Sequence, residues 1–164
     1  MDCQSIDPAP VHWRKGKLDV GTNWSRLGMD ITHYGGKHFL SLIDCGPSRF
    51  AMWRPIRCQD SGTVARQLEA VFYERGPPNE ILTDNDTAFT SRSFRNFLEE
   101  WGVRLRLRCA YAPSGNGIVE RCHWTIKTIA ARKQCTIREA VYWHNVTPKD
   151  DVSSSSAPAN RIHD

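Results

Sequence analysis

The chain has 164 residues, of which 40% are hydrophobic and 24% charged, a composition that fits one globular domain and excludes an intrinsically disordered chain. No apolar run approaches the roughly 20 residues needed to span a bilayer, and the first residues lack the basic and apolar regions of a secretion signal, so we expect neither a membrane protein nor a secreted one. The net charge of +4 permits a nucleic-acid partner without requiring one.

Both ends of the chain are predicted to be extended segments around one folded region. Residues 1–23 contain two prolines and a basic run, which favour loop over helix. Residues 148–164 are rich in serine, a composition that does not favour packing. We therefore expect an extended lead-in, a folded region over 24–147 and a flexible tail.

The first half of the folded region predicts three strands. Between residues 27 and 32, apolar residues occupy alternate positions, which is the pattern of a strand with one apolar face. Residues 39–43 and 50–53 are short apolar runs separated by a Gly-Pro-Ser turn. Three strands with short links predict an antiparallel meander.

The second half alternates helices with strands. Apolar residues at helical spacing predict helices over 64–72, 94–101 and 119–130, and a capping box at Thr136 opens a last helix. Strands are predicted over 81–84 and 103–109. Because a strand–helix–strand link implies parallel pairing, this order predicts an α/β fold in which a mixed sheet has helices on both faces.

Three acidic residues occupy informative places in this pattern. Asp30 lies inside a strand, where propensity disfavours an acid, and Asp84 lies at the carboxyl end of the fourth strand, where functional groups gather in open α/β sheets. Glu120 lies in the first turn of the long helix. Each also has a purely structural interpretation: an edge or salt-bridge residue for Asp30, an Asx turn for Asp84, and the helix dipole for Glu120.

Together the three acids would supply hard oxygen ligands, which suit Mg²⁺ or Mn²⁺ rather than zinc. Two such ions, about 3.5–4 Å apart, form a clamp for phosphoryl chemistry. One ion activates the attacking oxygen and the other stabilises the leaving oxygen.

Three segments around these acids resemble the catalytic core of retroviral and retrotransposon integrases. They are Leu27–Ile31, Thr83–Ser91 and Tyr111–Arg121. Residues 85 to 119, which are 35 residues, separate the second acid from the third, and this is the family's spacing. The resemblance covers about 24–147, and its Asn-Gly and Glu-Arg pairs look most like gypsy-type retrotransposon integrases.

This resemblance implies a ribonuclease-H-like, three-layer fold with a five-stranded mixed sheet. It makes Asp30, Asp84 and Glu120 the catalytic and metal-binding residues of a polynucleotidyl transferase that uses two Mg²⁺ or Mn²⁺ ions. Such an integrase cleaves the element's DNA near each 3′ end with water and then joins the exposed 3′ hydroxyls to target DNA. By the same analogy the core forms a homodimer or higher oligomer and acts in the nucleus.

Four further residues are candidate DNA contacts. Lys127 stands two helical turns after Glu120 and matches a family lysine that contacts the element's DNA end, although a solvated lysine is the alternative. Arg121 and Arg132 on the neighbouring helix face are candidate phosphate contacts. Asn116 belongs to a glycine-containing loop whose mobility would admit DNA.

Several features keep other interpretations open. Asp86 stands where the family usually has glycine, and its carboxylate either crowds the metal site or faces solvent. A catalytically silent, domesticated relative that binds DNA or protein is therefore an alternative, as is a different ribonuclease-H-like nuclease or transposase.

Cys3 resembles the last ligand of the zinc-binding domain that precedes the core in this family, or is an ordinary cysteine near a terminus. Trp124 is a candidate for a dimer contact or for DNA.

The six cysteines are scattered and form no Cys-x-x-Cys pair. Without a secretion signal they are predicted to be reduced and mostly buried thiols. A disulfide framework is therefore not expected.

Overall fold

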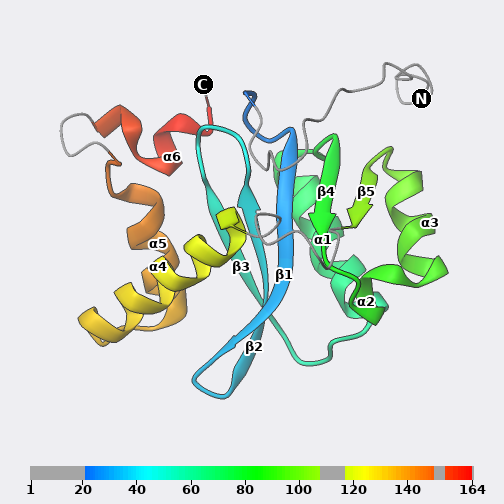
Figure 1. Ribbon diagram of the computed structural model, residues 1–164, viewed down its shortest axis with the longest axis horizontal. Coiled ribbons are helices and arrows are strands. Elements are labelled where there is room, and N and C mark those ends of the chain that lie inside the picture. Colours follow the sequence, from blue (N-terminus) through cyan, green and yellow to red (C-terminus); the bar gives the residue numbers. More distant parts are fainter. Residues whose placement is uncertain (1–20, 108–116, 150–153, 164) are drawn as a thin grey trace.

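The computed structural model describes residues 21–107, 117–149 and 154–163, and within these ranges a five-stranded sheet forms the centre of the molecule (Figure 1). Its strands are β1 Arg26–Tyr34, β2 Lys37–Asp44, β3 Ala51–Ile56, β4 Glu80–Thr83 and β5 Arg104–Leu107. They lie in the order β3-β2-β1-β4-β5. The first three pair antiparallel, whereas β4 pairs parallel with both β1 and β5. The predicted mixed sheet is confirmed.

Helices cover both faces of this sheet (Figure 1). They are α1 Ser61–Arg75, α2 Thr87–Thr90, α3 Arg92–Glu100, α4 Gly117–Lys133, α5 Ile137–Val146 and α6 Pro158–Arg161, with a 3₁₀ turn, η2, at Ser154–Ser156. Helices α1 and α3 share one hydrophobic core with the sheet, and α4 and α5 share the other. Among the described helices, none has both the length and the hydropathy that crossing a bilayer requires.

Side-chain caps explain where several helices begin. The Asp60 carboxylate accepts a hydrogen bond from the backbone N–H of Thr63 at 2.7 Å, which starts α1 and lowers the pKa of Asp60. Thr136 Oγ1 accepts from the backbone N–H of Glu139 at 3.1 Å and donates to the Glu139 carboxylate at 3.2 Å. The predicted cap of α5 by Thr136 is therefore confirmed, and the Glu139 carboxylate contacts the Thr136 hydroxyl.

The alternation of residues in β1 divides its side chains between the two cores. Leu27 and Met29 are fully buried in the core with α1 and α3. Gly28 faces α4 instead, because a Cβ atom built on it would lie 2.5 Å from Cγ2 of Val119. Since side chains alternate along a strand, Asp30 lies on the same face as Gly28, the one that α4 covers.

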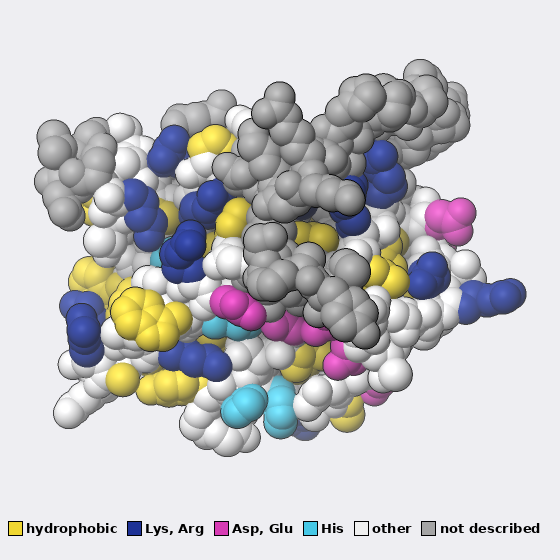
Figure 2. Space-filling view, in the orientation of Figure 1, with side chains coloured by type: hydrophobic (Ala, Val, Ile, Leu, Met, Phe, Trp, Pro, Cys, Tyr) yellow, Lys and Arg dark blue, Asp and Glu magenta, His cyan; other side chains and the backbone are white. Residues whose placement is uncertain are grey.

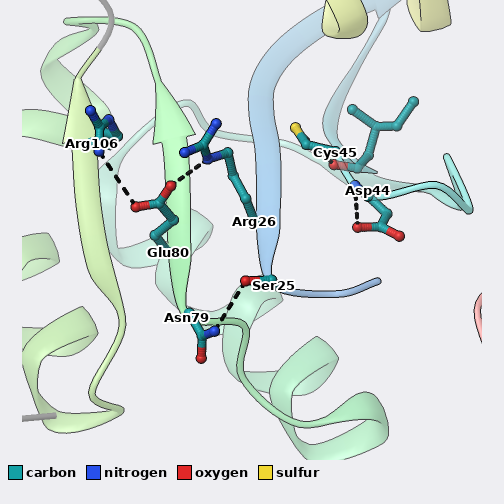
Figure 3. Close-up of polar contacts among 9 residues, drawn as sticks. Ser25, Arg26, Asp44, Cys45, Asn79, Glu80 and Arg106 are labelled. Atoms are coloured by element: carbon teal, nitrogen blue, oxygen red, sulfur yellow. Dashed lines mark hydrogen bonds and ion pairs between the residues drawn. The ribbon is translucent and has the colours of Figure 1, made fainter. Parts of the chain in front are cut away.

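A buried ion pair joins the starts of β1 and β4 (Figure 3). Arg26 and Glu80 are register partners, each is only 2% exposed, and Nε of Arg26 donates to the Glu80 carboxylate. A guanidinium nitrogen of Arg106 on β5 lies 3.9 Å from the other Glu80 oxygen. Glu80 therefore connects three adjacent strands and fixes the register that also sets the place of Asp84 at the far end of β4.

The end of the chain corrects one prediction. Residues 154–163 pack against the domain, so the expectation of a flexible tail over 148–164 is wrong for this part. Ala157 is 1% exposed, and Nδ2 of Asn23 donates to the carbonyl oxygen of Arg161 at 2.6 Å. Composition misled because it does not report tertiary contacts, and the residues buried here include Ala157 and Pro158, which lose almost no side-chain entropy on burial.

The predictions for residues 1–20, 108–116 and 150–153 lie outside the described residues.

Candidate active site

Strands β1 and β4 bring two aspartates to neighbouring positions. Their parallel register pairs Gly28 with Leu82, and Asp30 and Asp84 stand two residues further along each chain. Both aspartates are partly buried. Oδ1 of Asp30 accepts from the backbone N–H of Ile31 at 2.8 Å. The sheet itself thus sets the relative position of these two carboxylates.

Asp84 also takes part in the Asx turn considered from the sequence. Its Oδ1 accepts from the backbone N–H of Asp86 at 3.0 Å. Asp86 is exposed, and its carboxylate in turn caps α2 by accepting from the backbone N–H of Ala88 at 2.9 Å. Of the two expectations for Asp86, exposure to solvent is confirmed, and the helix cap gives this carboxylate a structural role.

Helix α4 carries the third acid, Glu120, in its first turn, exposed to solvent. One turn later, Nε2 of His123 lies 2.7 Å from Oγ of Ser41. Ser41 is the register partner of Asp30, and its hydroxyl donates to the Asp30 carbonyl at 3.2 Å. Because the hydroxyl has one hydrogen, Nε2 of His123 is then the donor to Ser41. This chain of contacts ties the helix turn next to Glu120 to the strand position of Asp30.

Asp30 and Asp84 lie on or directly after neighbouring strands, and Glu120 lies on α4, the helix that covers the face of Asp30, but the three acids are not gathered into a ligand cluster. Among the described residues, no group of three or more His, Cys, Asp or Glu side chains is placed to hold a metal ion. Figure 2 shows Asp and Glu side chains near the middle of the face on which α4 begins, next to His side chains. As donors, Asp30, Asp84 and Glu120 offer carboxylate oxygens alone, which fits Mg²⁺ or Mn²⁺ by chemistry.

The predicted DNA contacts lie on α4 where the structure describes them. Arg121 and Arg132 are exposed, and Lys127 is partly buried. The indole of Trp124, one turn after Glu120, is 67% exposed, so both alternatives for it, DNA and a dimer contact, stay open. Lys and Arg side chains are spread over the region of α4, α5 and α6 in Figure 2. Asn116 lies outside the described residues.

The model of the family described as "Integrase core domain" matches residues 24–113. The chain belongs to the integrase core domain family. Its five-stranded mixed sheet between two layers of helices is the ribonuclease-H-like fold of an integrase core, so the fold prediction is confirmed.

Retroviral and retrotransposon Pol polyproteins are relatives of this integrase core. It is 34% identical over 121 residues to the retrovirus-related Pol polyprotein from transposon 297 of Drosophila melanogaster, covering 74% of this chain and 10% of that protein. It is 36% identical over 138 residues to the Gag-Pol polyprotein of baboon endogenous virus (strain M7), covering 76% and 8%. It is 31% identical over 121 residues to the intracisternal A-particle Pol-related polyprotein of mouse intracisternal a-particle MIA14, covering 71% and 14%. The chain therefore spans only about a tenth of the length of these relatives.

Sequence reasoning did not find two of the contacts between α4 and the sheet. One is the Ser41–His123 hydrogen bond, for which the sequence carries no signal, since the two residues are 82 positions apart. The other is the close approach of Val119 to Gly28. A glycine inside a strand often marks a site where another segment approaches closely, so Gly28 carried a signal that was available.

Replacing Gly28 with alanine is expected to lower the free energy of unfolding by about 1–3 kcal/mol, the usual cost of overpacking. The new methyl group would lie 2.5 Å from Cγ2 of Val119, a β-branched side chain with little rotamer freedom. Removing that branch in Gly28→Ala/Val119→Ala should recover part of the loss. Urea denaturation of both single variants and the double variant measures this, and losses that simply add would contradict the close packing of α4 on β1.

Proposed function

We propose that this integrase core catalyses DNA integration as a metal-dependent polynucleotidyl transferase. It cleaves the element's DNA ends and joins their 3′ hydroxyls to target DNA. The observation that supports the proposal is the neighbouring position of Asp30 and Asp84 on β1 and β4, with Glu120 in the first turn of α4, in a member of this family. The Pol polyproteins among its relatives support the same conclusion.

In this proposal Asp30, Asp84 and Glu120 hold two Mg²⁺ or Mn²⁺ ions through their carboxylate oxygens. When bound, such ions stabilise the charge on the reacting phosphate and lower the pKa of an attacking water. The protein contributes position: the β1–β4 register fixes the aspartates, and the contacts of α4 with the sheet fix the turn that bears Glu120. No covalent nucleophile is needed, because orientation of the reacting oxygens supplies much of the rate.

DNA is the proposed partner, as both element ends and target. Lys127, Arg121 and Arg132 extend along α4 from Glu120, so phosphates held by them would follow the helix toward the acids. Asn116, in the segment that precedes α4, is proposed as a further DNA contact. A homodimer or higher oligomer and a nuclear location are part of the proposal by family analogy. Since the chain spans 8–14% of its relatives, complete integration is assigned to a longer protein, and the core alone is expected to catalyse at most the reverse, disintegration-type reaction.

The catalytically silent alternative is not favoured. It arose from Asp86, which is exposed and already serves as the cap of α2. All three family acids are present, whereas a binding module has no chemical need for them.

The test is a disintegration assay on a branched, fluorescently labelled DNA substrate. We expect joined product with Mg²⁺ or Mn²⁺, none after chelation with EDTA, and recovery when the metal is restored, because carboxylates alone cannot offset the charge of the reacting phosphate. Denaturing gels resolve joined, cleaved and unreacted strands. Metal-dependent cleavage without joining would point to a nuclease, and DNA binding without either reaction would point to the silent module.

A further inference from the structure

A small cavity beside α4 has an apolar wall that includes Ile43 and Ile118, and its described lining residues include three cationic side chains and no acidic one. Its volume is about 180 Å³, room for several water molecules at roughly 30 Å³ each. Arg49, Arg121 and Lys149 contribute positive charge, and Thr125 contributes a hydroxyl group. The buried Cys122 also lines it, and burial raises the pKa of this thiol to about 12, so it stays neutral. The net charge of this lining is therefore positive.

Arg49 is held in place by its own turn. Its backbone has a φ of 55°, which is uncommon for a residue other than glycine and persists only where the surroundings enforce it. Its Nη1 donates to the carbonyl oxygens of Cys45 at 2.7 Å and Gly46 at 2.6 Å. These bonds use one guanidinium nitrogen, and they fix the orientation of a group that has five N–H donors.

His144 also lines the cavity, and its side chain is buried, at 5% exposure. Its Nε2 lies 3.0 Å from the carbonyl oxygen of Arg49, which only accepts, so Nε2 carries the hydrogen. Nδ1 is then the acceptor, and Nζ of Lys149 lies 3.4 Å from it. Burial and the Lys149 charge lower the pKa of His144 to about 4, so the imidazole is neutral at pH 7.

We propose that this cavity binds a phosphodiester group of the DNA backbone, held by Arg49, Arg121 and Lys149. Charge-assisted hydrogen bonds from such groups are the usual means of holding a phosphate. The inference rests on the proposed function, because it needs a DNA substrate and because Arg121, which directly follows Glu120 in α4, is one of the proposed DNA contacts. An incoming phosphate would also offset the repulsion among the three cations.

The first test measures affinity for a fluorescent 20-base-pair duplex in EDTA, so that it does not depend on catalysis. We expect Lys149→Gln to weaken binding about tenfold and to lower the slope of log affinity against log salt by roughly one. Arg66→Gln is the matched control, because it removes the same charge from an exposed position on α1, on the opposite face of the sheet. Equal affinities and equal salt slopes for the two variants would overturn the proposal.

The second test follows the pKa of His144 by NMR, with the duplex, with inorganic phosphate and without either. A phosphate in the cavity stabilises the imidazolium, so the duplex should raise this pKa by about one unit or more. A rise with inorganic phosphate but not with DNA would overturn the DNA assignment, as would bound DNA that leaves the pKa unchanged. Neither DNA affinity in EDTA nor the pKa of His144 depends on catalysis. Failure of the joining assay would therefore overturn the proposed function without deciding whether this cavity binds DNA phosphate.

Discussion

Replacing Glu80 with alanine is expected to lower the free energy of unfolding by about 3–5 kcal/mol, the usual result of removing one partner from a buried ion pair. Arg26 would lose its carboxylate partner while remaining 2% exposed between β1 and β4. Arg106 would lose the same partner from β5. Urea denaturation at pH 7 gives the free energy from the midpoint and slope.

The matched control is Glu74→Ala. Glu74 forms a 2.8 Å ion pair with Arg54, but the two side chains are 53% and 29% exposed, so solvent screens the pair and its loss should cost at most about 1 kcal/mol. Equal losses in the free energy of unfolding for Glu74→Ala and Glu80→Ala would contradict the prediction that burial makes the loss of the Glu80 carboxylate more costly.

A double replacement separates the cost of an isolated charge from the value of the pair. Arg26→Met/Glu80→Leu removes both charges while keeping apolar volume, so it should be much less destabilising than Glu80→Ala. If it is as destabilising, the pair itself supplies net stability. The Arg26–Glu80 pair also bears on the candidate active site, because it joins β1 to β4, and the register of these strands places Asp84 next to Asp30.

The sequence predicted the elements because their signals are local. Alternation assigned the two faces of β1, helical spacing located α1, α3 and α4, and a capping box located the start of α5. The Arg26–Glu80 pair was not predicted, since its members are 54 residues apart and charge alone does not reveal burial. The same holds for the approach of Arg106 to Glu80, since these residues belong to different strands.

The prediction that the cysteines are mostly buried thiols was correct only in part. Among the described residues, Cys45 and Cys122 are buried free thiols, but Cys58 is exposed and Cys135 is partly buried. Burial of a single residue outside a periodic pattern depends on tertiary packing.

The order and spacing of the three acids predicted where to look for the site, and the sheet register then placed two of them side by side. Their catalytic roles stay predictions.

Replacing Glu120 with glutamine is expected to reduce metal-dependent joining by at least about a hundredfold, because changes to residues that merely support metal ligands already cost 10–100-fold. The amide keeps the size of the side chain but removes the charge that a hard cation prefers. Glu120 is exposed, so the free energy of unfolding should change by less than about 0.5 kcal/mol. Affinity for DNA should stay the same or rise, because one negative charge near the phosphates is gone.

Glu69→Gln is the control for this loss, since it removes the same charge from an exposed position on α1, on the far side of the sheet. Joining should be unchanged in Glu69→Gln and abolished in Glu120→Gln, measured on the same branched substrate with saturating Mg²⁺. Glu120→Asp then separates charge from reach: it keeps the carboxylate but withdraws it by one methylene. Partial activity in Glu120→Asp, with none in Glu120→Gln, would mean that the charge is indispensable and that α4 sets its position. Full activity in Glu120→Gln would remove this residue from the catalytic site.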